Sequence, residues 1–184
     1  MFIQTEQTPN PATLKFLPGR AVMGDAGTAS FASAEEAQRS PLAERLFEVE
    51  GVTGVFFGND FISVSKAEAQ EWYLLKPAVL GVIMEHFVAG KELLREAQAD
   101  GNAVEETDSE VVSTIKELLD TRVRPAVAQD GGDIIFRGFE DGVVLLHMQG
   151  ACAGCPSSTA TLKMGIENML RHYVPEVTEV RAVN

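Results

Sequence analysis

A polar, acidic segment just past the middle of the chain limits what this sequence can fold into. Residues 97–107 contain a Gly-Asn step and three acids, and Val104 is their only large apolar side chain. Such a composition is typical of a linker rather than of a helix or strand. The segment leaves residues 1–96 before it and residues 108–184 after it, and each part is long enough for a small domain. The sequence therefore predicts two small folded domains joined by a flexible linker.

Strand and helix signals alternate within residues 1–96. The predicted elements are strands at residues 1–6, 13–17, 52–57 and 61–64, and helices that begin near residues 41 and 77. A Pro-Asn-Pro turn separates the first two strands, and Gly58-Asn59-Asp60 separates the last two. Both helix starts carry a proline, which is well tolerated in the first turn of a helix.

Residues 108–184 predict the order helix, strand, strand, helix, strand. The helix runs toward Pro125, the strands cover residues 134–139 and 143–148, a second helix covers 156–174, and a last strand covers 177–183. Asp141-Gly142 is a strong hairpin signal between the two central strands. Alternating strands and amphipathic helices predict mixed α+β or α/β domains, each a two-layer sandwich.

Both cysteines of the chain, Cys152 and Cys155, lie in one loop between a predicted strand and a predicted helix. Two residues between them allow both sulfurs to reach one metal ion or cluster. The free backbone N–H groups of the helix start favour thiolate, the form that binds metals. One tight pair cannot form a disulfide framework, so it indicates metal binding or thiol redox chemistry.

The number of ligands that a metal site needs bears on the choice between metal binding and redox chemistry, but it does not decide it. A structural zinc or an iron–sulfur cluster commonly takes four ligands, and one chain supplies two cysteines. The three histidines are poor candidates to complete the site. His86 lies across the predicted linker, His147 lies within an apolar strand run, and His172 is about 25 Å of helix away from the cysteines. A second copy of the chain would supply two more thiolates. Zinc binding in a dimer and thiol-disulfide exchange stay open, although a redox pair of the thioredoxin type usually has proline between its cysteines.

Charge and apolar content exclude other classes of function. The net charge of −12 and the absence of a basic stripe argue against nucleic-acid binding. The apolar run at 77–84 is far shorter than the roughly 20 residues of a membrane-spanning helix. Residues 1–10 have neither the features of a secretory signal nor those of a transit peptide. We therefore expect a cytoplasmic protein of bacterial type that binds no membrane.

The sequence resembles the Nfu family of iron–sulfur proteins in both halves. In the second half the matching runs are DGGD at 130–133, G-x-C-x-x-C-P-S-S at 150–158 and L-x-x-G-I-E at 162–167. In the first half they are TPNP at 8–11, LKFLPG at 14–19, GV at 51–52, VFF at 55–57, and Trp72 with LKP at 75–77. Residues 1–96 thus resemble the family's N-terminal domain and residues 108–184 its NifU-like domain.

The resemblance implies a function. It implies a non-enzymatic scaffold or carrier in which Cys152 and Cys155 of two protomers hold one [4Fe-4S] cluster between them. It further implies an upstream cluster donor, and apo iron–sulfur proteins that receive the cluster. The N-terminal domain then has protein recognition as its expected role.

Overall fold

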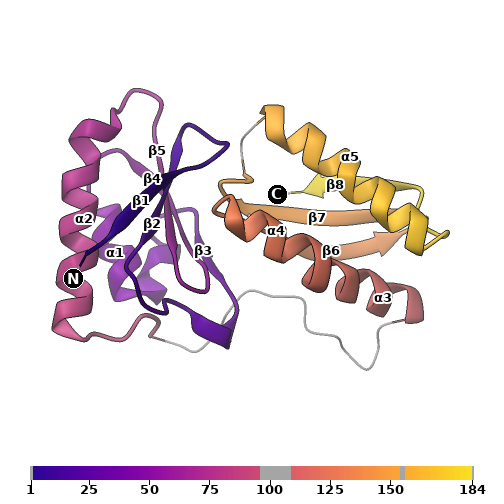
Figure 1. Ribbon diagram of the computed structural model, residues 1–184, viewed down its shortest axis with the longest axis horizontal. Helices are drawn as coiled ribbons and strands as arrows, with labels where there is room; N and C mark the ends of the chain where they lie inside the picture. The colour runs from indigo at the N-terminus through magenta and orange to yellow at the C-terminus, as the bar shows by residue number, and fades with distance from the viewer. Residues whose placement is uncertain (1, 96–108, 154–155, 184) are drawn as a thin grey trace. The chain divides into compact units, whose positions relative to one another are not determined.

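The computed structural model describes residues 2–95, 109–153 and 156–183, without the side chains of residues 26 and 156–159. Two compact units divide the chain, residues 1–100 and 101–184, and each combines helices with a sheet (Figure 1). The mixed α and β class predicted from the sequence is confirmed. The predicted linker, residues 97–107, lies outside the described residues.

The N-terminal unit contains a five-stranded antiparallel sheet in the order β1-β2-β5-β4-β3. Its strands are β1 (Gln4–Gln7), β2 (Thr13–Leu17), β3 (Ala29–Phe31), β4 (Val52–Phe57) and β5 (Ile62–Lys66). The two predicted strand pairs, β1 with β2 and β4 with β5, are confirmed. The sequence did not predict β3, a three-residue strand that pairs with β4 at the sheet edge.

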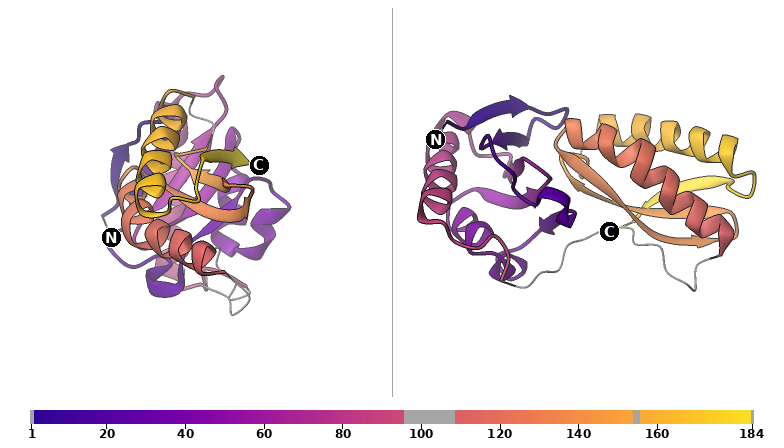
Figure 2. Two further views of the ribbon diagram at one scale, coloured as in Figure 1. Left: turned by 90° about the vertical axis from the view of Figure 1, so that its right-hand side faces the viewer. Right: turned by 60° about the horizontal axis from the view of Figure 1, so that its bottom comes forward.

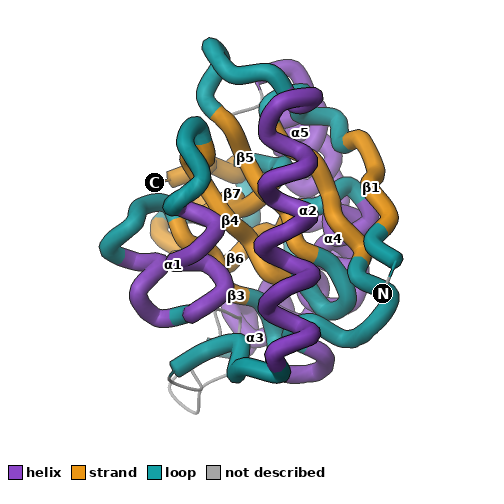
Figure 3. Tube along the Cα trace, turned by 90° about the vertical axis from the view of Figure 1, so that its left-hand side faces the viewer, coloured by secondary structure: helices purple, strands orange, loops and turns teal. Residues whose placement is uncertain are grey.

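Helices α1 (Pro41–Phe47) and α2 (Trp72–Ala89) lie next to each other over one face of this sheet (Figure 3). Two short 3₁₀ turns, η1 (Gly24–Ala26) and η2 (Glu36–Arg39), precede α1. The Ser40 hydroxyl caps α1 by accepting a hydrogen bond of 3.1 Å from the Ala43 N–H, and the predicted first-turn proline of α1 is confirmed.

Helix α2 begins five residues earlier than the sequence predicts. Pro77 lies inside the helix, on the exposed side, where water can solvate the carbonyl group that the missing N–H leaves unpaired. Trp72 fixes the start, because its indole N–H donates to the Pro11 carbonyl at 3.2 Å and its ring packs edge-on against Phe16. This tertiary contact outweighs the local preference for a helix start at proline.

The C-terminal unit opens with one helical run in three parts, α3 (Glu110–Leu118), a π-helical turn η3 (Leu119–Val123) and α4 (Arg124–Gln129). The Ser109 hydroxyl caps the run by accepting from the Val112 N–H at 3.2 Å. Pro125 does not end the helix. The π-helical turn lies just before it and takes up the change in hydrogen-bond pattern that a proline imposes.

A three-stranded sheet in the order β6-β7-β8 completes this unit. Strands β6 (Gly132–Glu140) and β7 (Val143–Gly150) are antiparallel, α5 (Pro156–Tyr173) crosses over, and β8 (Glu179–Val183) returns parallel to β7. Figure 2 shows α3, α4 and α5 together on one side of the sheet. The predicted element order is thus confirmed.

Candidate functional site

The loop that carries the first cysteine begins where β7 ends. Gly150 has a φ of 62°, a conformation that favours glycine, and it turns the chain out of the strand. The N–H of Ala151 then donates to the Gly131 carbonyl at 3.1 Å, and the Cys152 N–H to the Gln149 carbonyl at 3.3 Å. Helix α5 begins at Pro156, as predicted. The loop is therefore hydrogen-bonded to the double-glycine turn that precedes β6.

Cys152 lies inside the core of the C-terminal unit rather than on its surface. Its side chain is 7% exposed and belongs to the apolar cluster that also contains Ile134, Met148 and Ile166. The sequence places Cys152 in a loop and does not indicate this burial. Cys155 lies outside the described residues.

Gly132 provides the surface on which the Cys152 sulfur rests. A Cβ atom at position 132 would lie 2.5 Å from Cys152 Sγ and 2.9 Å from both the Cys152 nitrogen and the Gln149 carbonyl oxygen. These distances are shorter than real Cβ contacts, and two of the three atoms belong to the backbone. Position 132 therefore accepts only glycine without displacing the cysteine loop.

Gly132→Ala is expected to destabilise the C-terminal unit by about 1–3 kcal/mol and to lower iron binding, because the loop must move away from the added methyl group. Gly165→Ala is the matched control, since a Cβ atom there meets nothing within 4 Å and alanine favours the helix. Hydrogen exchange in β6 and β7 measures the stability. Equal stability of the Gly132→Ala chain and the parent chain would contradict this account of Gly132.

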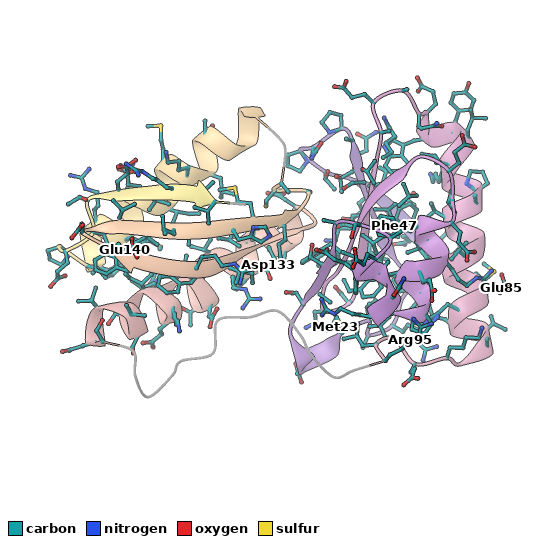
Figure 4. All side chains as sticks on the ribbon, turned by 180° about the vertical axis from the view of Figure 1, so that it is seen from behind. Met23, Phe47, Glu85, Arg95, Asp133 and Glu140 are labelled. Atoms are coloured by element: carbon teal, nitrogen blue, oxygen red, sulfur yellow. The ribbon has the colours of Figure 1, made fainter. Side chains whose placement is uncertain are left out.

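An ion pair lies beneath the same turn. Asp133, labelled on β6 in Figure 4, accepts from Arg124 Nε at 2.7 Å and from Arg124 Nη2 at 2.6 Å. The pair is bidentate, and the Asp133 side chain is only 3% exposed. Asp120 accepts from Arg124 Nη1 at 3.1 Å from the more exposed side. The π-helical turn that ends at Val123 delivers Arg124 to this position.

The surroundings of Arg124 have opposing effects on the pKa of its guanidinium. Burial lowers the pKa of the Arg124 guanidinium, but hydrogen bonds and attraction to Asp133 and Asp120 outweigh burial, so the net pKa lies above the ordinary value. Arg124 therefore stays a cation. Its fork holds the carboxylate of Asp133 next to Gly132, and Gly132 in turn supports Cys152.

No pattern in the sequence singles out Arg124, and Asp133 is noted there only as part of the DGGD run at 130–133. One signal was present in the sequence. Asp133 comes directly before the apolar run at 134–136, and an acid within a buried strand needs a cation. Its partner lies nine residues earlier, so the sequence gives no direct sign of which base that is.

The histidines lie in different surroundings. His86 is buried in α2, where burial lowers its pKa and nearby Lys91 and Arg45 lower it further. The His147 Nδ1 atom is 3.2 Å from the Val183 carbonyl oxygen on β8, and the His172 ring packs against Tyr173. Among the residues that the structure describes, no three His, Cys, Asp or Glu side chains are grouped so as to hold a metal ion.

Comparison with protein families matches each unit separately. Residues 3–90 match the model "Scaffold protein Nfu/NifU N terminal", and residues 115–181 match "NifU-like domain". The chain belongs to the Nfu family. The resemblance found in the sequence is thereby confirmed over both units.

Curated relatives from Drosophila agree with this assignment. Proteins named "NFU1 iron-sulfur cluster scaffold homolog, mitochondrial" are 56% identical in Drosophila sechellia and 55% identical in Drosophila erecta, over all of this chain and 65% of each relative. The Nfu chain thus spans about two thirds of the relatives' length. A solution structure of a NifU-like protein from Saccharomyces cerevisiae is 24% identical, covers 52% of this chain and 86% of that one, and has a TM-score of 0.48.

The names of these relatives contradict the expected cytoplasmic location, because they include the word mitochondrial. As to organelle, the expectation rested on the composition of residues 1–10. Composition over so few residues says little about location in a chain that spans 65% of its relatives' length.

Proposed function

We propose that this Nfu chain is a non-enzymatic iron–sulfur cluster carrier. Two copies hold one [4Fe-4S] cluster between Cys152 and Cys155 of each, receive it from an upstream donor and deliver it to apo iron–sulfur proteins. Its location follows that of its mitochondrial relatives. The observation that carries the proposal is the Cys152 loop, which the Gly131-Gly132 turn holds at the point where β7 leads into α5.

The number of thiols supports sharing between two copies. One chain has two cysteines, and a [4Fe-4S] cluster commonly takes four thiolates. A two-fold axis through the cluster supplies the other pair without any change to the chain. None of the three histidines lies in the cysteine loop, which supports the same arrangement.

The burial of Cys152 bears on how the cluster is transferred. In this structure its sulfur packs against the core, so ligation of a cluster requires the thiol to turn outward. When an acceptor's thiolates take the cluster, the side chain can return to the core. Burial of the sulfur in the core then contributes to release of the cluster. The transfer exchanges one set of thiolate ligands for another, and no side-chain acid or base makes or breaks a bond.

Anaerobic reconstitution with iron and sulfide tests the proposal. The expected product is a dimer with about four irons and four sulfides, measured by native mass spectrometry under exclusion of oxygen. One zinc per dimer without sulfide would instead indicate a zinc-stabilised dimer. Reversible oxidation of Cys152 with Cys155, coupled to reduction of a protein disulfide and without retained iron, would indicate a thiol-disulfide oxidoreductase.

A further inference from the structure

Cys152 is a nucleophilic residue that the structure keeps inside the protein. Its thiol is in no disulfide, and the residue is 7% exposed. Cysteines that react readily lie in partly exposed surroundings, whereas cysteines buried among apolar groups are inert. The side chain proposed above as a cluster ligand thus occupies a position typical of an unreactive thiol.

The backbone around Cys152 fixes the direction of its side chain. The N–H groups of residues 151–153 all donate to main-chain carbonyl groups of the same unit, at 3.1–3.3 Å. Gly131 and Gly150, whose carbonyls accept two of these bonds, both have positive φ, 82° and 62°. Glycine adopts such angles without strain, so the turn holds its shape. Rotation of the Cys152 side chain is therefore the smallest movement that brings its sulfur out of the core.

Apolar packing favours the inward direction of this side chain. Cys152 belongs to the buried cluster that also contains Ile134, Met148 and Ile166. A thiol behaves there as a small apolar group, so it loses little by leaving water. When the sulfur turns outward, its neighbours lose their contacts with it, and a void of about one sulfur atom is left. The inward position is therefore the more stable one as long as no ligand holds the sulfur outside.

The inward position of Cys152 and ligation of a shared cluster exclude each other. A cluster that takes thiolates from two chains lies outside the core of either chain, and a sulfur packed within that core does not reach it. The side chain thus has two positions, one shielded and one open. A ligand that binds only the open position shifts the population toward it. This step rests on the carrier function proposed above.

We propose that the Gly132 turn and the apolar cluster form a resting position, which shields the Cys152 thiol whenever the chain carries no cluster. A peroxide converts an exposed thiol to sulfenic acid with release of water, and further oxidation is irreversible. The resting position keeps the thiol reduced between two rounds of cluster transfer. It opens by a local movement of the side chain and not by unfolding of the unit.

Alkylation of the full chain with iodoacetamide, after reduction and removal of metal, measures the shielding. Trypsin cleaves after Arg137 and Lys163, so both cysteines lie in one peptide, and fragment masses tell which of them is modified. The rate at Cys152 is expected to be at least about tenfold lower in the folded chain than in the same chain in concentrated urea. Equal rates in the folded and the unfolded chain would overturn the proposal.

Gly132→Ala is expected to raise the alkylation rate of Cys152 at least about tenfold, because the added methyl group takes the place of the sulfur. Val177→Ala is the matched control. Val177 is 2% exposed, and the N–H of its neighbour Thr178 donates to the Gly142 carbonyl at 2.8 Å, at the opposite end of the sheet from Gly132. This change destabilises the same unit away from the cysteine loop, so it should raise the rate less than about twofold.

Hydrogen exchange in β6 and β7 shows how far each variant destabilises the C-terminal unit. If both variants speed alkylation in proportion to their loss of stability, reagents reach the thiol only through unfolding, and the proposed resting position with its local opening is overturned. The carrier proposal is tested separately, because iron and sulfide retention after reconstitution does not depend on the alkylation rate. Either proposal can therefore fail while the other holds.

Discussion

Cys152→Ala is expected to abolish iron and sulfide binding and to leave the C-terminal unit folded. In a cluster shared by two chains, this one change removes two of the four thiolates, and the remaining pair is too few to hold the cluster. Alanine keeps the site apolar, which matters because the Cys152 side chain lies among core residues. Cys152→Ser places a hydroxyl group in that core and is expected to cost about 1–3 kcal/mol in addition to losing the cluster.

Iron and sulfide analysis after anaerobic reconstitution measures the loss, and hydrogen exchange in β6 and β7 measures the stability. Ala153→Ser is the matched control, because the residue is exposed in the same loop and its backbone bond to the Gly150 carbonyl is kept. This variant should bind iron as the parent chain does. Full iron binding by the Cys152→Ala chain would rule out Cys152 as a ligand.

Local signals predict the C-terminal unit well because its turns are set by its own residues. Asp141 and Gly142 both have positive φ, 50° and 80°, which is the two-residue turn that Asp-Gly favours between antiparallel strands. Pro156 likewise stands at the first position of α5. In both cases the residue that sets the conformation lies within the element whose position it predicts.

The features that sequence patterns miss depend on contacts between distant residues. Strand β3 has three residues, too few for a periodic pattern, and it exists because it pairs with β4. The start of α2 depends on the Trp72 contact with Pro11, 61 residues away. At the candidate site, the spacing of the cysteines predicts the loop. The inward position of Cys152 depends on Gly132 in a neighbouring strand, and no spacing rule conveys it.

Arg124→Gln is expected to destabilise the C-terminal unit by about 3–5 kcal/mol, because it leaves the buried carboxylate of Asp133 without its bidentate cation. The Ile134 N–H also donates to Asp133, at 2.8 Å, but a neutral amide does not replace the positive charge of a guanidinium. Since Asp133 adjoins Gly132, the same change is expected to loosen the support of the Cys152 loop and to lower iron binding.

Two further variants separate the buried pair from general effects of charge. Asp120→Asn removes the partner on the exposed side of Arg124 and should cost less than about 1 kcal/mol. Arg124→Gln combined with Asp133→Asn removes both charges, and it should be more stable than Arg124→Gln alone because no unpaired carboxylate stays buried. Hydrogen exchange in β6 and β7 reports these changes, while Trp72 fluorescence should show an unchanged N-terminal unit. The opposite outcome is that the destabilisations caused by Arg124→Gln and Asp133→Asn simply add in the double variant. In that case the two side chains would not act as a pair, and the Cys152 loop would have to be supported from elsewhere in the turn.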